Sequence, residues 1–160
     1  MKNNHIFQFI GMNSRNCLLL LFTSICMLSL FSSCELETSH NGDLDGMWHL
    51  IRVDTLENGH YADLQNEKIY WSFQRKLLQL DDKSGRNTSI LFYFDRQASN
   101  MKVYNAYIYD RNKGDEKLND PMFLHPYGLS KLEENLNIEH LSGGKLLLST
   151  AKLRLRFVKF

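Results

Sequence analysis

The sequence has little cysteine, little proline and no long hydrophobic run. Its three cysteines all lie within the first 34 residues, so the chain after Cys34 cannot form an internal disulfide. Its two prolines, Pro121 and Pro126, are close together, and the rest of the chain has no proline breaks. The longest apolar stretch, Leu18–Phe31, has 14 residues, whereas a membrane-spanning helix needs about 20. These absences disfavour both a disulfide-stapled miniature domain and a helical membrane protein.

A charge imbalance and the common catalytic motifs are also absent. The 19 Lys and Arg residues against 18 Asp and Glu residues give a net charge of +1, and no basic patch for nucleic acid stands out. The sequence has no Gly-x-Ser-x-Gly element, no phosphate-binding loop and no His-Glu-x-x-His pair, and its six histidines are scattered. The adjacent carboxylates Asp81-Asp82 and Glu133-Glu134 are interpreted as turn and helix-surface charges. The sequence therefore predicts no enzymatic activity, no metal site and no cofactor.

The apolar stretch ends at Ser32-Ser33-Cys34, where two small residues directly precede a cysteine. A polar start, a short apolar run and small residues at its end are typical of an export signal with a processing site. The cysteine resembles that of a bacterial lipobox, which receives diacylglycerol and becomes the new N-terminus. The resemblance implies a signal peptide over residues 1–33, a lipid on Cys34, and an outer-membrane lipoprotein facing the periplasm or the cell surface. An ordinary secretory signal and an uncleaved anchor are the alternatives.

The next segment, residues 34–45, is polar and aperiodic. It predicts a flexible tether of about ten residues between the membrane and a folded domain. Glu35 and Glu37 resemble the acidic signals that send some Gram-negative lipoproteins to the cell surface, although a solvated linker also contains such residues. The remaining residues, 46–160, predict a single domain.

From residue 46 onward, apolar and polar residues alternate in short segments bounded by turn residues, as in half-buried strands. Asp81–Gly85 and Ser142–Gly144 are the clearest turns. Eight strands are predicted, over residues 47–54, 68–74, 75–80, 88–95, 101–110, 136–141, 145–149 and 153–160. Eight short antiparallel strands without a disulfide predict an all-β fold, a small up-and-down barrel whose closure leaves no free edge. An open sandwich is the alternative.

Residues 111–135 depart from this pattern. The segment begins as a charged loop, and its two prolines prevent a strand between them. Ser130-Lys-Leu-Glu133 matches a helix capping box, which predicts a short helix over about residues 131–135. We therefore expect a short helix or irregular insert before the last three strands.

The start and the end of the predicted domain resemble a known family. Leu44-Asp-Gly46-Met-Trp48 is similar to the Gly-x-Trp opening of lipocalins and of lipocalin-like domains in bacterial lipoproteins, and residues 138–157 resemble their closing hairpins. The resemblance implies that Trp48 packs at the closed end of the barrel beneath an arginine, in a cation–π contact. Arg154 and Arg156 are the candidate arginines. The alternative is that both face solvent, since Leu153, Leu155 and Phe157 occupy the other side of the strand.

Aromatic residues are the other abundant feature of the predicted strands. One strand phase, predicted to face inward, holds Trp71, Phe73, Phe92, Phe94, Tyr107 and Tyr109; the opposite phase holds Tyr70, Tyr93 and Tyr104. The inner set either fills the barrel or lines a pocket for a small hydrophobic or aromatic ligand. The first possibility predicts a protein-interaction module, an accessory subunit or inhibitor of another envelope protein, with residues 111–127 as its contact loop. The second predicts a lipid-anchored binding protein.

Overall fold

The computed structural model describes residues 39–160, so the predicted signal peptide and Cys34 lie outside the described part of the chain. Two 3-10 helices, η1 (Gly42–Leu44) and η2 (Pro121–Tyr127), accompany the strands. The strands are β1 (Gly46–Thr55), β2 (Tyr61–Asp63), β3 (Ile69–Gln74), β4 (Leu77–Asp82), β5 (Ile90–Gln97), β6 (Asn100–Ile108), β7 (Glu116–Lys117), β8 (Glu134–Ser142), β9 (Lys145–Ser149) and β10 (Leu153–Lys159).

Eight of these strands form a closed antiparallel barrel. In the order β1, β3, β4, β5, β6, β8, β9 and β10, each strand pairs with the next, and β10 pairs with β1 to close the ring. The short strands β2 and β7 pair with β1 and β6 at the margin of the barrel. The prediction of a small up-and-down barrel is confirmed, and the insert before β8 leaves the strand order unchanged.

The alternation that predicts the strands also sets which side chains enter the core. In β3, Ile69, Trp71 and Phe73 are buried while the residues between them are half-buried. In β10, Leu155 and Phe157 are buried in the same way. Because successive side chains of a strand point to opposite faces, this period of two places one set inside the barrel and the other on its surface.

The helix predicted over residues 131–135 is absent. Residues 131–133 form bends, and β8 begins at Glu134, which pairs with Val103 of β6. The helical turn is η2 instead, where the Asp120 carboxylate accepts a hydrogen bond from the Met122 N–H at 2.9 Å and Gly128 ends the turn with a φ of 81°. Strand pairing with β6 therefore overrides the local capping signal at Ser130.

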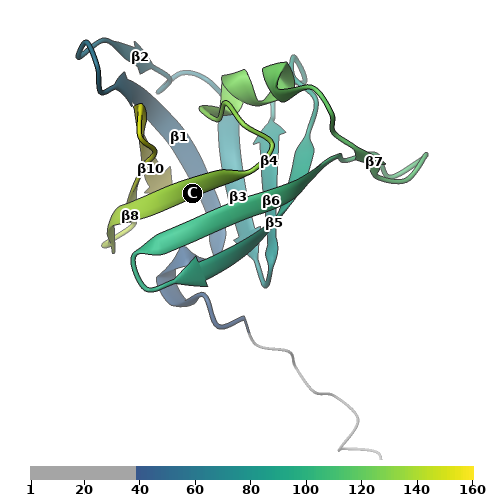
Figure 1. Cartoon of the computed structure of the whole chain (residues 1–160), viewed down its shortest axis with the longest axis horizontal. Coiled ribbons are helices and arrows are strands. Elements are labelled where there is room, and N and C mark those ends of the chain that lie inside the picture. Colours follow the sequence, from purple (N-terminus) through teal and green to yellow (C-terminus); the bar gives the residue numbers. More distant parts are fainter. Residues whose placement is uncertain (1–38) are drawn as a thin grey trace, which may run out of the picture. The chain divides into compact units, whose positions relative to one another are not determined.

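The two helices mark opposite ends of the barrel (Figure 1). β1 leaves η1 and runs to the far end, where η2 lies, and the strands then alternate in direction. The β3–β4, β5–β6 and β8–β9 turns therefore lie at the η1 end, and the β4–β5 and β9–β10 turns at the η2 end.

The first described residues belong to the folded domain. The Asp45 carboxylate accepts hydrogen bonds from Ser39 at 2.9 Å and from Asn41 at 2.8 Å. Leu44 is completely buried. The predicted tether over residues 34–45 is therefore too long, because residues 39–45 are anchored by Leu44 and this hydrogen-bonded network.

Candidate functional site

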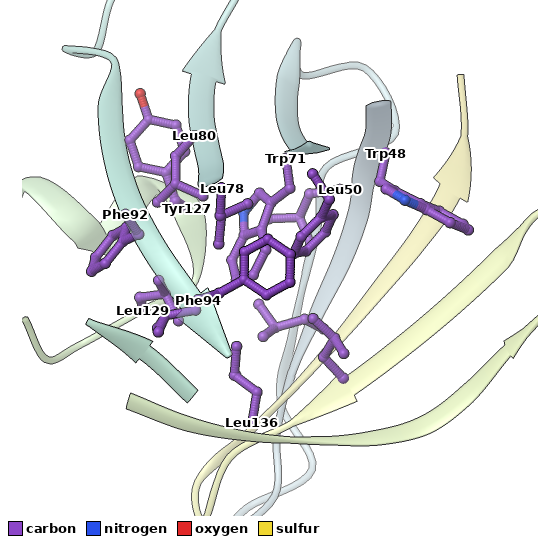
Figure 2. Close-up of a cluster of buried hydrophobic side chains, with 14 of the residues drawn as sticks. Trp48, Leu50, Trp71, Leu78, Leu80, Phe92, Phe94, Tyr127, Leu129 and Leu136 are labelled. Carbon is purple, nitrogen blue, oxygen red and sulfur yellow. The ribbon is translucent and has the colours of Figure 1, made fainter. Parts of the chain in front are cut away.

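Four of the six aromatic residues predicted to face inward meet in the barrel interior. Trp71, Phe73, Phe92 and Phe94 are all at most 2% exposed. Phe73 and Phe94 meet edge to face, with ring centres 5.3 Å apart, and Trp71 meets Phe157 at 5.1 Å. Figure 2 shows Trp71, Phe92 and Phe94 among the surrounding leucine side chains. This cluster is the place where an interior ligand would have to bind.

Tyr107 and Tyr109 do not join this cluster, so the prediction is wrong for these two. The residue two positions before Tyr107, Asn105, has a φ of 53°, in the left-handed region that asparagine tolerates. Leu91 pairs with Tyr107 but Tyr93 pairs with Tyr104, so β6 has one extra residue, a β-bulge. The bulge reverses the alternation, and both tyrosines become half-buried outside the core. An asparagine within a strand pattern is the sequence signal that could have revealed it.

The insert fills the η2 end of the barrel. Leu124 and Tyr127 are fully buried, and Leu129 is 1% exposed. The Tyr127 hydroxyl donates a hydrogen bond to the Thr88 carbonyl at 2.8 Å, and burial raises the pKa of this phenol. A Cβ at Gly128 would lie 2.2 Å from Cδ2 of Leu155, so only glycine fits there. Part of the predicted contact loop is thus a plug, as the position of Tyr127 and Leu129 beside Leu80 and Phe92 indicates (Figure 2).

Trp48 and η1 close the opposite end. Trp48 is 1% exposed, and its Nε1–H donates to the Leu44 carbonyl at 2.8 Å. The cation over its ring is Lys159, whose Nζ lies 4.9 Å from the ring centre. The predicted contact with Arg154 or Arg156 is therefore wrong.

The two arginines pair with carboxylates instead. Arg156 contacts Asp54 at 2.8 Å, and Arg154 contacts Glu139 at 2.9 Å. Leu155 and Phe157 occupy the inward positions of β10, so Arg154 and Arg156, which alternate with them, must project from the other face. Both guanidinium groups are part of the barrel exterior, with side chains 43% and 36% exposed.

The interior between these two ends is filled. Trp71, Leu78, Phe92, Val103 and Leu155 have no surface that water can reach. A cavity large enough for water beside any of them would give that side chain accessible area. Within this interior the Trp71 Nε1–H is buried without a hydrogen-bond acceptor among the described residues.

The outer faces of β4, β5 and β6 carry an aromatic and aliphatic surface, the tyrosine face, composed of Leu77, Leu91, Tyr93, Tyr104 and Tyr107. Leu77 and Tyr104 both pair with Tyr93, from opposite sides, and Leu91 pairs with Tyr107. The rings of Tyr93 and Tyr104 stack with centres 6.2 Å apart. Leu77 and Tyr93 are 36% and 41% exposed. Strand pairing thus makes one continuous patch from residues spread over 31 positions of sequence.

Tyr70, the third tyrosine predicted to face outward, lies elsewhere. Its ring stacks on His49 at 5.0 Å and meets Phe160 edge to face at 5.3 Å. It therefore belongs to a separate cluster on β1 and β3. Tyr104, in contrast, belongs to the tyrosine face, and a hydrogen bond with Asp95 raises the pKa of its phenol.

An open groove of about 550 Å³ lies at the η1 end. Its lining includes three cations, two carboxylates and two apolar side chains: Arg75, Lys76, Arg96, Asp43, Asp95, Phe94 and Leu141. Arg96 donates from Nη1 to the Asn41 carbonyl at 2.6 Å, which joins the groove wall to the first described residues.

The described residues do not assemble a metal site. No three histidine, cysteine, aspartate or glutamate side chains within residues 39–160 gather closely enough to hold an ion. Asp82 is held by hydrogen bonds from Ser84 at 2.5 Å and Asn87 at 2.8 Å, so it stabilises the β4–β5 turn. No helix in this part of the chain is long and apolar enough to span a membrane.

Comparison with known proteins agrees with this architecture. A family model described as a lipocalin-like domain matches residues 28–160. A lipocalin-like protein from Bacteroides uniformis is 19% identical, with a TM-score of 0.57, over 74% of this chain and 100% of that chain. An uncharacterized protein from Bacteroides eggerthii is 18% identical, with a TM-score of 0.54, over 73% of this chain and 99% of that chain. At these identities the two structures indicate the fold alone, and no curated protein matches the sequence.

Proposed function

The chain belongs to the lipocalin-like domain family, and we propose that it is a lipid-anchored protein of the outer membrane that acts through the surface of a filled barrel. In this proposal Cys34 carries the lipid, and the domain serves as an accessory subunit or inhibitor of another envelope protein. The proposal selects the interaction module over the ligand carrier.

The observation that carries the proposal is the packing of the barrel interior. The aromatic cluster occupies the middle, the insert fills the η2 end, and Trp48 with Leu44 fills the η1 end. Ligand pockets in proteins are usually largely pre-formed and have volumes of about 300–1,000 Å³. An interior ligand of that size would have to displace several of the large buried side chains, so the outer surface is the better candidate.

The tyrosine face is the proposed contact surface. Tyrosines are common anchors of protein interfaces because they combine apolar area with a polar end and few rotatable bonds. β7 continues this surface, since Tyr107 pairs with Lys117. Beyond β7, Met122 and Phe123 of η2 are 63% and 44% exposed. The predicted contact loop, residues 111–127, thus adjoins the tyrosine face.

Site-specific photocrosslinking tests this proposal in cells that produce the full chain. A photoreactive phenylalanine at position 93 or 104 is expected to give an adduct of one defined size with an envelope protein. The matched control is position 152, an exposed site in the β9–β10 turn at the η2 end. Absence of an adduct from both tyrosine positions, or the same adducts from position 152, would contradict the proposal.

The proposed lipid anchor has a separate test. Cys34→Ala is expected to abolish incorporation of a labelled fatty acid and to leave an unprocessed or soluble protein. Label that persists on the variant would show that the lipid is attached elsewhere.

A second candidate function, binding of a small hydrophobic or aromatic ligand inside the barrel, is favoured by one observation. The buried Trp71 Nε1–H has no acceptor among the described residues, and such a group costs about 1–3 kcal/mol when left unpaired. A ligand with an acceptor atom would satisfy it. Native mass spectrometry of the delipidated protein tests this: a co-purifying small molecule that Trp71→Ala or Phe92→Ala releases, and Tyr93→Ala retains, would favour the ligand carrier.

A further inference from the structure

The groove at the η1 end lies where the chain enters the domain. Its wall includes the first described residues, because the Asn41 carbonyl accepts a hydrogen bond from Arg96 at 2.6 Å. Ser39 precedes this contact and is fixed to Asp45. Whatever holds the chain upstream of Ser39 is therefore attached at the η1 end and not at the end that η2 fills.

The proposed lipid on Cys34 would bring this end close to the bilayer. Five residue steps separate Cys34 from Ser39, and a fully extended chain covers at most about 18 Å over five steps. The headgroup layer of a bilayer is about 5–8 Å thick, and charges interact over a screening length of about 8 Å at physiological salt. The η1 end thus lies within electrostatic reach of the headgroups.

The cations of this end are suited to an anionic partner. Arg96 and Lys159 both donate to uncharged backbone carbonyls, of Asn41 and Asp43 respectively. Lys76 makes no ion pair within residues 39–160. Two carboxylates line the groove, Asp43 and Asp95, and Asp95 is engaged by a hydrogen bond with Tyr104. The three cations Arg75, Lys76 and Arg96 therefore outnumber the carboxylates of the groove.

Arg75 lies in a strained turn at the wall of this groove. Arg75 occupies the β3–β4 turn with a φ of 56°, in the left-handed region that glycine adopts freely and other residues adopt at a cost. Backbone strain of this kind, kept in place by the surrounding structure, often marks a functional position. Glycine would relieve the strain, so Arg75→Gly removes the guanidinium group without a backbone cost.

We propose that the η1-end groove, with Arg75, Lys76 and Arg96, binds the phosphate of an anionic phospholipid headgroup in the membrane that holds the anchor. The guanidinium groups supply paired N–H donors that match phosphate oxygens, and Lys76 adds a point charge. Binding in the groove orients the barrel with its η1 end on the bilayer and the η2 end away from it. This inference rests on the proposed lipid anchor.

A coupled-vesicle experiment tests the proposal independently of lipidation in cells. The chain from residue 34 has Cys34 as its only thiol, so it can be attached to a maleimide lipid in phosphatidylcholine vesicles with or without phosphatidylglycerol. Acetylation rates of individual lysines, measured by mass spectrometry, report which end is covered. Lys145 at the η1 end is expected to react several-fold more slowly on phosphatidylglycerol vesicles, whereas Lys113 and Lys152 at the η2 end keep their rates.

Paired variants identify the groove as the cause. Arg75→Gly with Lys76→Gln is expected to lower the ratio of docked to free domain by about fivefold for each cation removed, so that Lys145 regains its rate. The same change of charge at the far end, Lys113→Gln with Lys152→Gln, is expected to leave the protection of Lys145 intact. An unchanged or higher melting temperature of the Arg75→Gly variant shows that its loss of docking is not a loss of folding.

Three outcomes would overturn the proposal. The first is that Lys145 is protected as strongly on pure phosphatidylcholine vesicles as on those with phosphatidylglycerol. The second is that Lys113 and Lys152 are protected as strongly as Lys145. The third is that Lys145 stays protected in the Arg75→Gly, Lys76→Gln variant. Protection produced by inorganic phosphate on phosphatidylcholine vesicles would assign the groove to free phosphate instead. Fatty-acid labelling of Cys34 in cells tests the anchor separately, so failure of the anchor and failure of the groove are distinguishable.

Discussion

Replacing Gly128 with alanine tests how tightly the insert packs against the barrel. Gly128 has a φ of 81° and follows η2 directly, and a Cβ built on it would lie 2.2 Å from Cδ2 of Leu155. Leu155 is fully buried. The alanine must therefore push apart the insert and β10.

Two costs contribute to the expected loss of stability. The left-handed conformation costs an alanine about 1–2 kcal/mol relative to glycine. Overfilling a packed core costs a further 1–3 kcal/mol or so. We expect Gly128→Ala to lower the free energy of unfolding by about 2–5 kcal/mol, a large part of the roughly 5–15 kcal/mol that stabilises a typical domain.

Gly143→Ala is the matched control, because Gly143 has a φ of 57° and no atom within 4 Å of its built Cβ. It should lose only the conformational part, about 1–2 kcal/mol. Urea unfolding followed by tryptophan fluorescence measures both variants. Adding Leu155→Ala to Gly128→Ala should cost less than Leu155→Ala alone, since the alanine at 128 occupies part of the space that Leu155 leaves. Equal losses for the two glycine variants, or strictly additive effects with Leu155→Ala, would refute the packing argument.

Two further changes test the η1 end and the β4–β5 turn. Trp48→Ala should lower the free energy of unfolding by about 3–5 kcal/mol, as truncation of a large buried aromatic does; an unchanged urea midpoint would show that Trp48 does not close the barrel. Asp82→Asn should destabilise the domain at neutral pH by about 1–3 kcal/mol. Burial raises the pKa of Asp82, but the hydrogen bonds from Ser84 and Asn87 outweigh burial and hold this pKa below its usual value. The contribution of Asp82 is therefore present above the unfolded-state pKa of about 4 and lost as the pH falls below it. Urea melts of the parent and the variant should converge in acid, and a difference that stays constant from pH 7 to pH 3 would contradict this.

The barrel could be predicted because its signals are local. Alternation in segments such as residues 69–74 directly reports one buried and one exposed face, and eight such segments without a disulfide are compatible with few folds. The same alternation identified Trp71, Phe73, Phe92 and Phe94 as interior residues. It failed after Asn105, because a single extra residue in β6 reverses the phase and a simple period cannot anticipate it.

The insert shows how local signals compete. Asp120, Pro121 and Gly128 form a complete set of start and stop signals for a helical turn, and the structure uses them. The capping box at Ser130 is an equally good local signal, yet β8 begins at Glu134 because that residue pairs with Val103. Which of two local signals prevails depends on which strand lies beside the segment in the fold. The sequence of the segment alone does not specify that neighbouring strand.

The sequence by itself predicted the strands, the closed antiparallel architecture and the family, because each depends on residue order or on a short period along the chain; the export signal and the lipid on Cys34 stay predictions. Only the tertiary structure decided that the barrel is filled, that Lys159 and not an arginine covers Trp48, and that Leu77, Tyr93 and Tyr104 form one surface. Those features join residues far apart in the chain. They follow from the register in which the strands pair and from the volume left at each end once the barrel closes. Neither the register nor that volume is specified by any single segment of the chain.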